Sequence, residues 1–164
     1  MASVLQFVTL LLLCGPLLTC NQSPPGPVPC DCDCRPCPAG WSKTGPRCFR
    51  FFNTPDTWSN AESACIALNA NLASVRSKNE QSLIKSIVQS VSGDVQTAWI
   101  GGNDAVKEGV WRWSDGSRFV NIAWATGEPN NLGTENCMEI YIKVNGYNDL
   151  PCESKRPYVC GFTQ

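Results

Sequence analysis

The sequence predicts an α+β domain stapled by disulfides, and three observations support this fold class. Apolar residues recur with helical spacing over 56–68 and again over 77–93. Short strand-like segments separated by turns follow from residue 97 onward. Eleven of the 164 residues are cysteine, which indicates an oxidising compartment where disulfides supplement a modest core. The length fits one domain, and no internal repeat indicates a second.

Residues 1–20 are predicted to be a secretory signal peptide. The apolar run Val4–Leu13 ends at Gly15-Pro16, is too short to span a bilayer, and is not followed by a second apolar stretch. Because Met1-Ala2-Ser3 carries no positive charge, a membrane anchor is the alternative. We therefore expect an extracellular protein without a membrane span.

Residues 21–36 are expected to form an extended arm. Prolines crowd the segment 24–29, and Cys30, Cys32 and Cys34 then alternate with two aspartates. Such a composition cannot build a core. The alternation is compatible with thiolate metal ligands, but cysteines of secreted chains usually form disulfides.

The folded domain is predicted to span residues 37–164, starting with two short strands around Gly45-Pro46. The first helix follows the capping candidates Asp56 and Thr57, and its buried face comprises Trp58, Ala61, Cys65 and Leu68. The second helix begins at a capping box made by Ser77 and Glu80 and ends at Gly93. Its buried face comprises Leu83, Ile84, Ile87, Val88 and Val91.

Strands are expected at 98–102, 111–113, 139–144 and 158–162. A long loop rich in Asn, Gly and Pro covers 121–136, and long structured loops are usually functional. This loop and the acidic segment 147–152 collect three carboxylates and two amides: Glu128, Asn130, Glu135, Asn148 and Asp149. A hard cation such as Ca²⁺ takes about six to eight oxygen ligands, so the pattern predicts a calcium site. A solvated acidic loop without an ion is the alternative.

Charge and composition exclude several functions. Lys and Arg total 13 against 14 for Asp and Glu, so no net field attracts nucleic acid. The absence of His removes the commonest general base and zinc ligand. Because the chain also lacks a nucleophile motif and a phosphate loop, we expect a binding protein and not an enzyme.

One ordered set of residues runs through the chain: Cys37, Cys48, Cys65, Trp99-Ile100-Gly101, Trp124, Gly127-Glu128-Pro129-Asn130, Glu135-Asn136-Cys137, Asn148-Asp149, Cys152 and Cys160. In this set the chain resembles a C-type lectin-like domain over nearly all of 37–162. The resemblance implies a C-type lectin-like fold in which two helices flank antiparallel sheets below a long calcium-binding loop. It also implies the pairings Cys37–Cys48, Cys65–Cys160 and Cys137–Cys152. Secreted single-domain fish lectins and fish type II antifreeze proteins look like the nearest architectural relatives.

The resemblance also assigns the site. The family's principal calcium ligands correspond to Glu128, Asn130, Glu135, Asn148 and Asp149, and the family's cis peptide bond precedes Pro129. In the family's auxiliary calcium site two acidic positions match, Asp104 and Glu108. The other two are Asn131 and Asn136, which weakens the attraction for a dication.

The function implied is that of a secreted calcium-dependent lectin for glycans, including those of microbial surfaces as in innate immunity. Glu-Pro-Asn in the family selects equatorial vicinal hydroxyls, as in mannose, N-acetylglucosamine and fucose. An ice-binding protein like the type II antifreeze proteins is the alternative. Three cysteines remain once the leader and the three pairings are subtracted, namely Cys30, Cys32 and Cys34. They predict a disulfide-linked homo-oligomer, with a monomer whose thiols are capped as the alternative.

Overall fold

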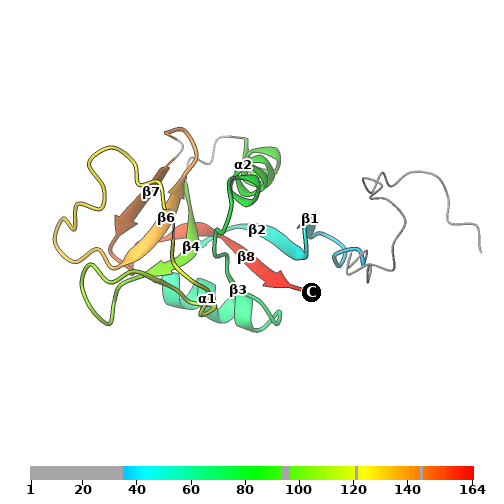
Figure 1. The fold of residues 1–164 in the computed structure, drawn as a ribbon, viewed down its shortest axis with the longest axis horizontal. Helices are drawn as coiled ribbons and strands as arrows, with labels where there is room; N and C mark the ends of the chain where they lie inside the picture. The colour runs from blue at the N-terminus through cyan, green and yellow to red at the C-terminus, as the bar shows by residue number, and fades with distance from the viewer. Residues whose placement is uncertain (1–34, 94–96, 121, 145) are drawn as a thin grey trace, which may run out of the picture. The chain divides into compact units, whose positions relative to one another are not determined.

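The computed structural model describes residues 35–93, 97–120, 122–144 and 146–164 (Figure 1). The predicted signal peptide and the arm cysteines Cys30, Cys32 and Cys34 lie outside these described residues. Within the described ranges, no helix is both long enough and apolar enough to cross a membrane.

Eight strands form one mixed sheet. They are β1 (Ser42–Thr44), β2 (Arg47–Asp56), β3 (Asn71–Leu72), β4 (Thr97–Asn103), β5 (Arg112–Trp113), β6 (Cys137–Tyr141), β7 (Gly146–Leu150) and β8 (Arg156–Thr163). The sheet order is β1-β2-β8-β4-β6-β7, while β3 pairs with β8 and β5 pairs with β4. The prediction of antiparallel sheets was wrong at one pair, because β4 and β8 are parallel at Trp99 and Tyr158. Strand β8 lies between β2, with which it pairs antiparallel, and β4, with which it pairs parallel.

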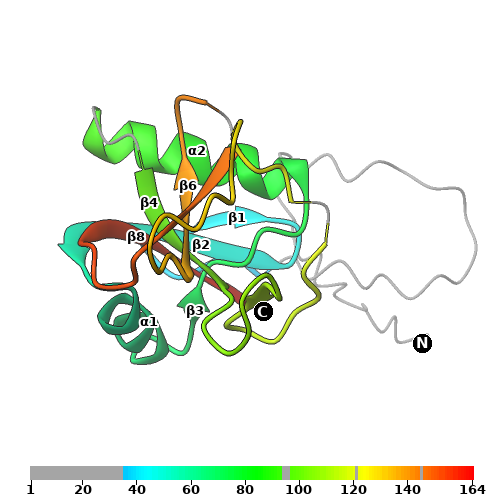
Figure 2. The same cartoon turned by 90° about the vertical axis from the view of Figure 1, so that its left-hand side faces the viewer.

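Two helices cover opposite faces of this sheet (Figures 1 and 2). Helix α1 (Trp58–Ile66) begins after Thr57, whose side chain accepts a hydrogen bond from the Asn60 N–H. Helix α2 (Lys78–Ser92) begins after Ser77, whose Oγ accepts from the Glu80 N–H at 3.2 Å. The N-terminal caps of both helices are confirmed.

The buried apolar face of each helix is shorter than predicted. Leu68 lies beyond the end of α1 and is 43% exposed, and Val91 lies in the last turn of α2 and is 62% exposed. Both residues continue the apolar spacing, but neither packs in the core. The spacing extends past the part of each helix that contacts the sheet.

The sheet separates two apolar clusters. Along β4, Ala98 and Ile100 belong to the cluster under α2, whereas Trp99 belongs to the cluster under α1. This assignment follows from the alternation of side chains along a strand. The same alternation continues in β8, where Val159 faces α2 and Cys160 faces α1.

Three disulfides connect the elements as the resemblance implied: Cys37–Cys48, Cys65–Cys160 and Cys137–Cys152. The second joins α1 to β8, and the third joins the start of β6 to the turn after β7. Close packing also explains Gly101, where an added Cβ would lie 2.5 Å from the carbonyl oxygen of Leu72. Of these constraints, Cys137–Cys152 links the two strands β6 and β7 on which the candidate site depends.

Candidate functional site

The candidate site is built on the β6–β7 pair and the long loop that precedes β6. The strands pair antiparallel from Cys137 opposite Leu150 to Tyr141 opposite Gly146. Strand β7 covers most of the predicted acidic segment 147–152, and Asn148 and Asp149 lie on this strand. Strand β6 also ends at Tyr141, three residues before its predicted end.

Asp149 ties the loop to the sheet. Its side chain is 1% exposed. Its Oδ1 accepts from the Asn130 N–H at 3.1 Å, and its Oδ2 accepts from the Asn131 N–H at 2.9 Å. Asn131 has a φ of 46°, which turns two successive backbone N–H groups toward the same carboxylate. The carboxylate of Asp149 therefore fixes the turn that follows Pro129.

Glu128 lies beside Asp149 on this turn. The Glu128–Pro129 peptide bond is cis, as the resemblance implied. The Glu128 carboxylate accepts from the Asn130 N–H at 3.1 Å. Partial burial raises the pKa of Glu128 above its ordinary value, and the neighbouring Asp149 carboxyl raises this pKa further. Two carboxylates held this close repel each other, and a bound cation relieves that repulsion.

Glu135 closes the loop on itself. Its side chain is 7% exposed, and Oε2 accepts from the Leu132 N–H at 2.8 Å. The same N–H is shared with Oδ1 of Asn130 at 3.0 Å. The backbone N–H of Glu135 in turn donates to Oδ1 of Asn131 at 3.1 Å. Glu135 and Asn130 are thus brought together through one backbone N–H group.

Asn148 forms a hydrogen bond with Glu139, a residue that was not among the sites predicted from the sequence. Its Nδ2 donates to Oε1 of Glu139 at 3.0 Å, and Oε2 of Glu139 accepts from Nε of Arg156 at 2.8 Å. Glu139 interrupts the otherwise apolar strand Cys-Met-Glu-Ile-Tyr, and this buried charge is the signal that sequence reasoning missed.

The five predicted ligands fit a hard cation in their chemistry, because all of them offer oxygen atoms. Hydrogen bonds bring together Glu128, Asn130 and Asp149, and Glu135 joins them through the loop backbone. Asn148 precedes Asp149 on β7. No group of three or more Asp, Glu, His or Cys side chains forms a metal-binding cluster among the residues described. Glu128, Glu135 and Asp149 therefore do not by themselves form such a cluster in the described structure.

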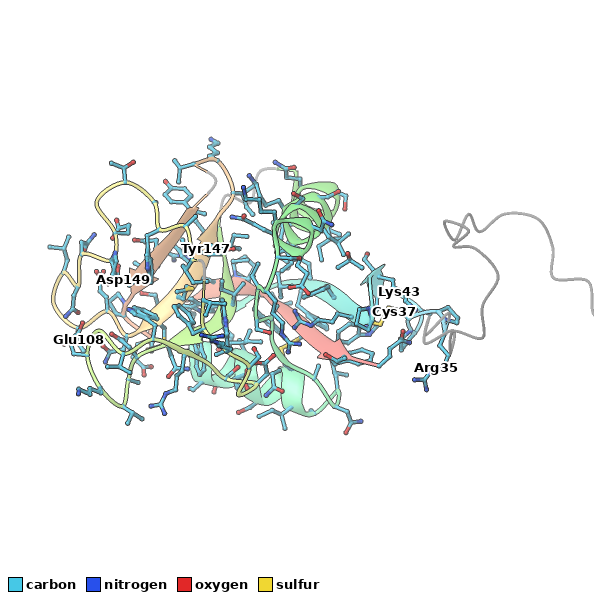
Figure 3. The ribbon with its side chains drawn as sticks, viewed as in Figure 1. Arg35, Cys37, Lys43, Glu108, Tyr147 and Asp149 are labelled. Atoms are coloured by element: carbon cyan, nitrogen blue, oxygen red, sulfur yellow. A yellow bond between two sulfur atoms is a disulfide. The ribbon has the colours of Figure 1, made fainter. Side chains whose placement is uncertain are left out.

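The predicted auxiliary residues Asp104 and Glu108 lie in the loop after β4, and Glu108 lies at the same end of the domain as Asp149 (Figure 3). Asp104 is 1% exposed, and its Oδ2 accepts from the Gly109 N–H at 2.7 Å. In the described part of the chain its Oδ1 is buried without a hydrogen-bond partner, which fits a second cation. Glu108 is exposed. Asn136 is joined to Asp104 through the backbone, where the Asp104 N–H donates to the Asn136 carbonyl at 3.2 Å.

The model of the Lectin C-type domain matches residues 54–162, which include both helices and every predicted ligand. The chain belongs to the C-type lectin family. It is 43% identical over 125 residues to the galactose-specific lectin nattectin of Thalassophryne nattereri, and the match covers 76% of this chain and 79% of nattectin.

Two solved C-type lectin-like structures resemble the fold. The C-type lectin CEL-I from Cucumaria echinata has a TM-score of 0.74 and 32% identity, and the match covers 79% of this chain and 99% of CEL-I. A calcium-independent type II antifreeze protein has a TM-score of 0.70 and 34% identity, covering 77% and 94% of the two chains. The C-type lectin fold therefore occurs both in lectins and in a protein that does not require calcium.

Proposed function

We propose that this C-type lectin is a secreted, calcium-dependent carbohydrate-binding protein. The observation that carries the proposal is that the backbone N–H of Asn130 donates to the carboxylates of both Glu128 and Asp149, which lie close together. Without a bound cation, two such carboxylates repel each other, and a cation bound between them would remove this repulsion. Membership of a lectin family supports a sugar as the remaining ligand.

The chain's own side chains account for recognition of two adjacent sugar hydroxyls. A calcium ion held by these residues would offer coordination positions to the oxygen atoms of both hydroxyls. Glu128 and Glu135 accept a hydrogen bond from the hydroxyls, while the amides of Asn130 and Asn148 donate to them. Each hydroxyl then has both a donor and an acceptor. A sugar with the wrong stereochemistry leaves one of these groups unpaired, at a cost of about 1–3 kcal/mol.

The specificity proposed is for equatorial vicinal hydroxyls, as in mannose, N-acetylglucosamine and fucose. It depends on the Glu128-Pro129-Asn130 turn, in which a carboxylate precedes an amide. The relative nattectin is named as galactose-specific, so galactose is the sugar against which this proposal must be compared.

The full chain is expected to bind immobilised mannose in calcium and to elute on addition of a chelator. Free mannose should elute the protein at lower concentration than free galactose. Retention after chelation would contradict the calcium mechanism, whereas better elution by galactose would contradict only the sugar specificity. A measured freezing-point hysteresis without any sugar binding would instead favour the ice-binding alternative, in keeping with the antifreeze relatives.

We further propose that the protein is a disulfide-linked homo-oligomer. Three disulfides in the described domain are consistent with an oxidising compartment. Arg35, where the described chain begins, lies at the end of the domain opposite Asp149 (Figure 3). Several candidate sites on one oligomer would bind repeated sugars with higher avidity than a single site.

On a non-reducing gel the secreted protein should migrate as a dimer or larger species that reductant converts to monomer. The control is a variant in which Cys30, Cys32 and Cys34 are changed to serine, which should be monomeric under both conditions. A monomer band from the unaltered protein without reductant is the result that would disprove the link.

A further inference from the structure

Glu139 is a buried charge outside the five predicted ligands. Its side chain is 3% exposed, whereas that of its partner Arg156 is 34% exposed. One carboxylate oxygen of Glu139 accepts a hydrogen bond from Asn148, and the other accepts one from Arg156. A carboxylate this buried requires such partners, because removing a charge from water is costly. Glu139 therefore has two fixed donors and one defined orientation.

The β-sheet register makes the contact with Asn148 obligatory. Glu139 on β6 stands directly opposite Asn148 on β7. Opposite residues of an antiparallel pair project from the same face and lie close together. An ionised carboxylate can only accept hydrogen bonds, so the amide must turn its Nδ2 toward Glu139. The amide oxygen of Asn148 then points away from Glu139 and is free for another partner.

We propose that Glu139 is a positioning residue, which holds the Asn148 amide with its oxygen available to the calcium ion of the lectin site. This role rests on the proposed calcium-dependent function. If the amide were reversed, Asn148 would present an NH₂ group to a cation, which repels it. Arg156 contributes by fixing the second oxygen of Glu139. Outer groups of this kind commonly orient the ligands of a metal site.

Glu139→Gln is a sharp test, because glutamine has one oxygen where glutamate has two. The charged guanidinium of Arg156 attracts that oxygen more strongly than a neutral amide does. The NH₂ of the new glutamine then faces Asn148, whose amide must rotate to offer its oxygen. The substitution thus reverses Asn148 and removes a ligand without changing the shape of the side chain.

Two further variants separate positioning from general damage. Glu62→Gln is the matched control, because Oε1 of Glu62 accepts from Nδ2 of Asn71 at 2.7 Å, between α1 and β3. The double variant Glu139→Gln with Arg156→Met tests rescue. Without Arg156, the oxygen of the new glutamine is free to accept from Asn148 again. Both charges of the ion pair are removed together, so no buried charge is left without its partner and this variant should fold.

The measurements are calcium affinity by calorimetry without sugar, and the side-chain NH₂ signals of Asn148 and Asn71 by NMR without calcium. Glu139→Gln should lose about 10- to 100-fold in calcium affinity. Its Asn148 signal should shift while that of Asn71 does not. Glu62→Gln should retain the affinity and shift only Asn71. The double variant should recover most of the lost affinity.

Equal affinities in Glu139→Gln and the unaltered protein would overturn the role of Glu139 alone. Equal losses of calcium affinity in Glu139→Gln and Glu62→Gln would also overturn it, and so would a further loss in the double variant. Either result is what general destabilisation of the domain would produce. If the unaltered protein binds no calcium, the proposed function fails and the role of Glu139 fails with it. The NMR signals would still report whether Glu139 orients Asn148.

Discussion

Asp149→Asn is expected to abolish calcium-dependent sugar binding. The substitution removes one charge from the candidate site and replaces one acceptor oxygen with an NH₂ group. The new NH₂ group faces the backbone N–H of Asn130, which still donates to Glu128, or the backbone N–H of Asn131. If it faces Asn131, the loss of that hydrogen bond adds a further cost of about 1–3 kcal/mol, which is the cost of leaving a buried donor unpaired. Loss of calcium affinity should reach roughly 100-fold or more, because residues that merely orient ligands already contribute about 10- to 100-fold.

Calorimetry with calcium, followed by retention on immobilised mannose, measures this loss. Glu153→Gln is the matched control, since Glu153 is exposed in the turn just after Cys152 and loses the same charge. The control should bind calcium as the unaltered protein does. Calcium affinity within a few-fold of normal in Asp149→Asn would remove Asp149 from the set of ligands.

The helices could be predicted from the sequence because their signals are local. Thr57 and Ser77 cap them as expected, and Gly93 ends α2 with a φ of 59°. Leu68 and Val91 could not be placed correctly, since helical spacing does not indicate where contact with the sheet ends. That boundary is a property of the packed domain.

The sheet topology was harder to predict from the sequence than the helices, because strand pairing depends on residues far apart in the chain. The insertion of β8 between β2 and β4 creates the parallel pair at Trp99 and Tyr158. Strand β3 is only two residues long and has no detectable alternation. Strand β7 contains the polar pair Asn148-Asp149, which hides its strand character. Its identity depends on pairing with β6.

In the candidate site, too, one part could be predicted from the sequence and another part could not. The residue types alone indicated which side chains could supply oxygen ligands to a cation. The structure then joins Glu128, Asn130 and Asp149, because the backbone N–H of Asn130 donates to both carboxylates. The role of Glu139 depends on the cross-strand register, which composition does not reveal. The assignment of the five side chains as calcium ligands stays a prediction for the binding experiments.

Removing the Cys65–Cys160 disulfide, by changing both cysteines to alanine, should lower the free energy of unfolding by about 4–5 kcal/mol. The bond closes a segment in which the two cysteines are 95 residues apart. Such a long closed loop restricts the unfolded chain strongly. Both cysteines are also fully buried between α1 and the sheet, so smaller side chains leave a packing defect.

The matched comparison is removal of Cys37–Cys48, whose cysteines are only 11 residues apart. Its loss should cost about 3 kcal/mol, and urea unfolding of both variants measures the difference. Equal losses would show that restriction of the unfolded chain does not dominate. Because this bond joins α1 to β8 and not to β6 or β7, the folded fraction of this variant should keep its calcium affinity. A parallel loss of affinity would instead show that the site depends on the packing of α1.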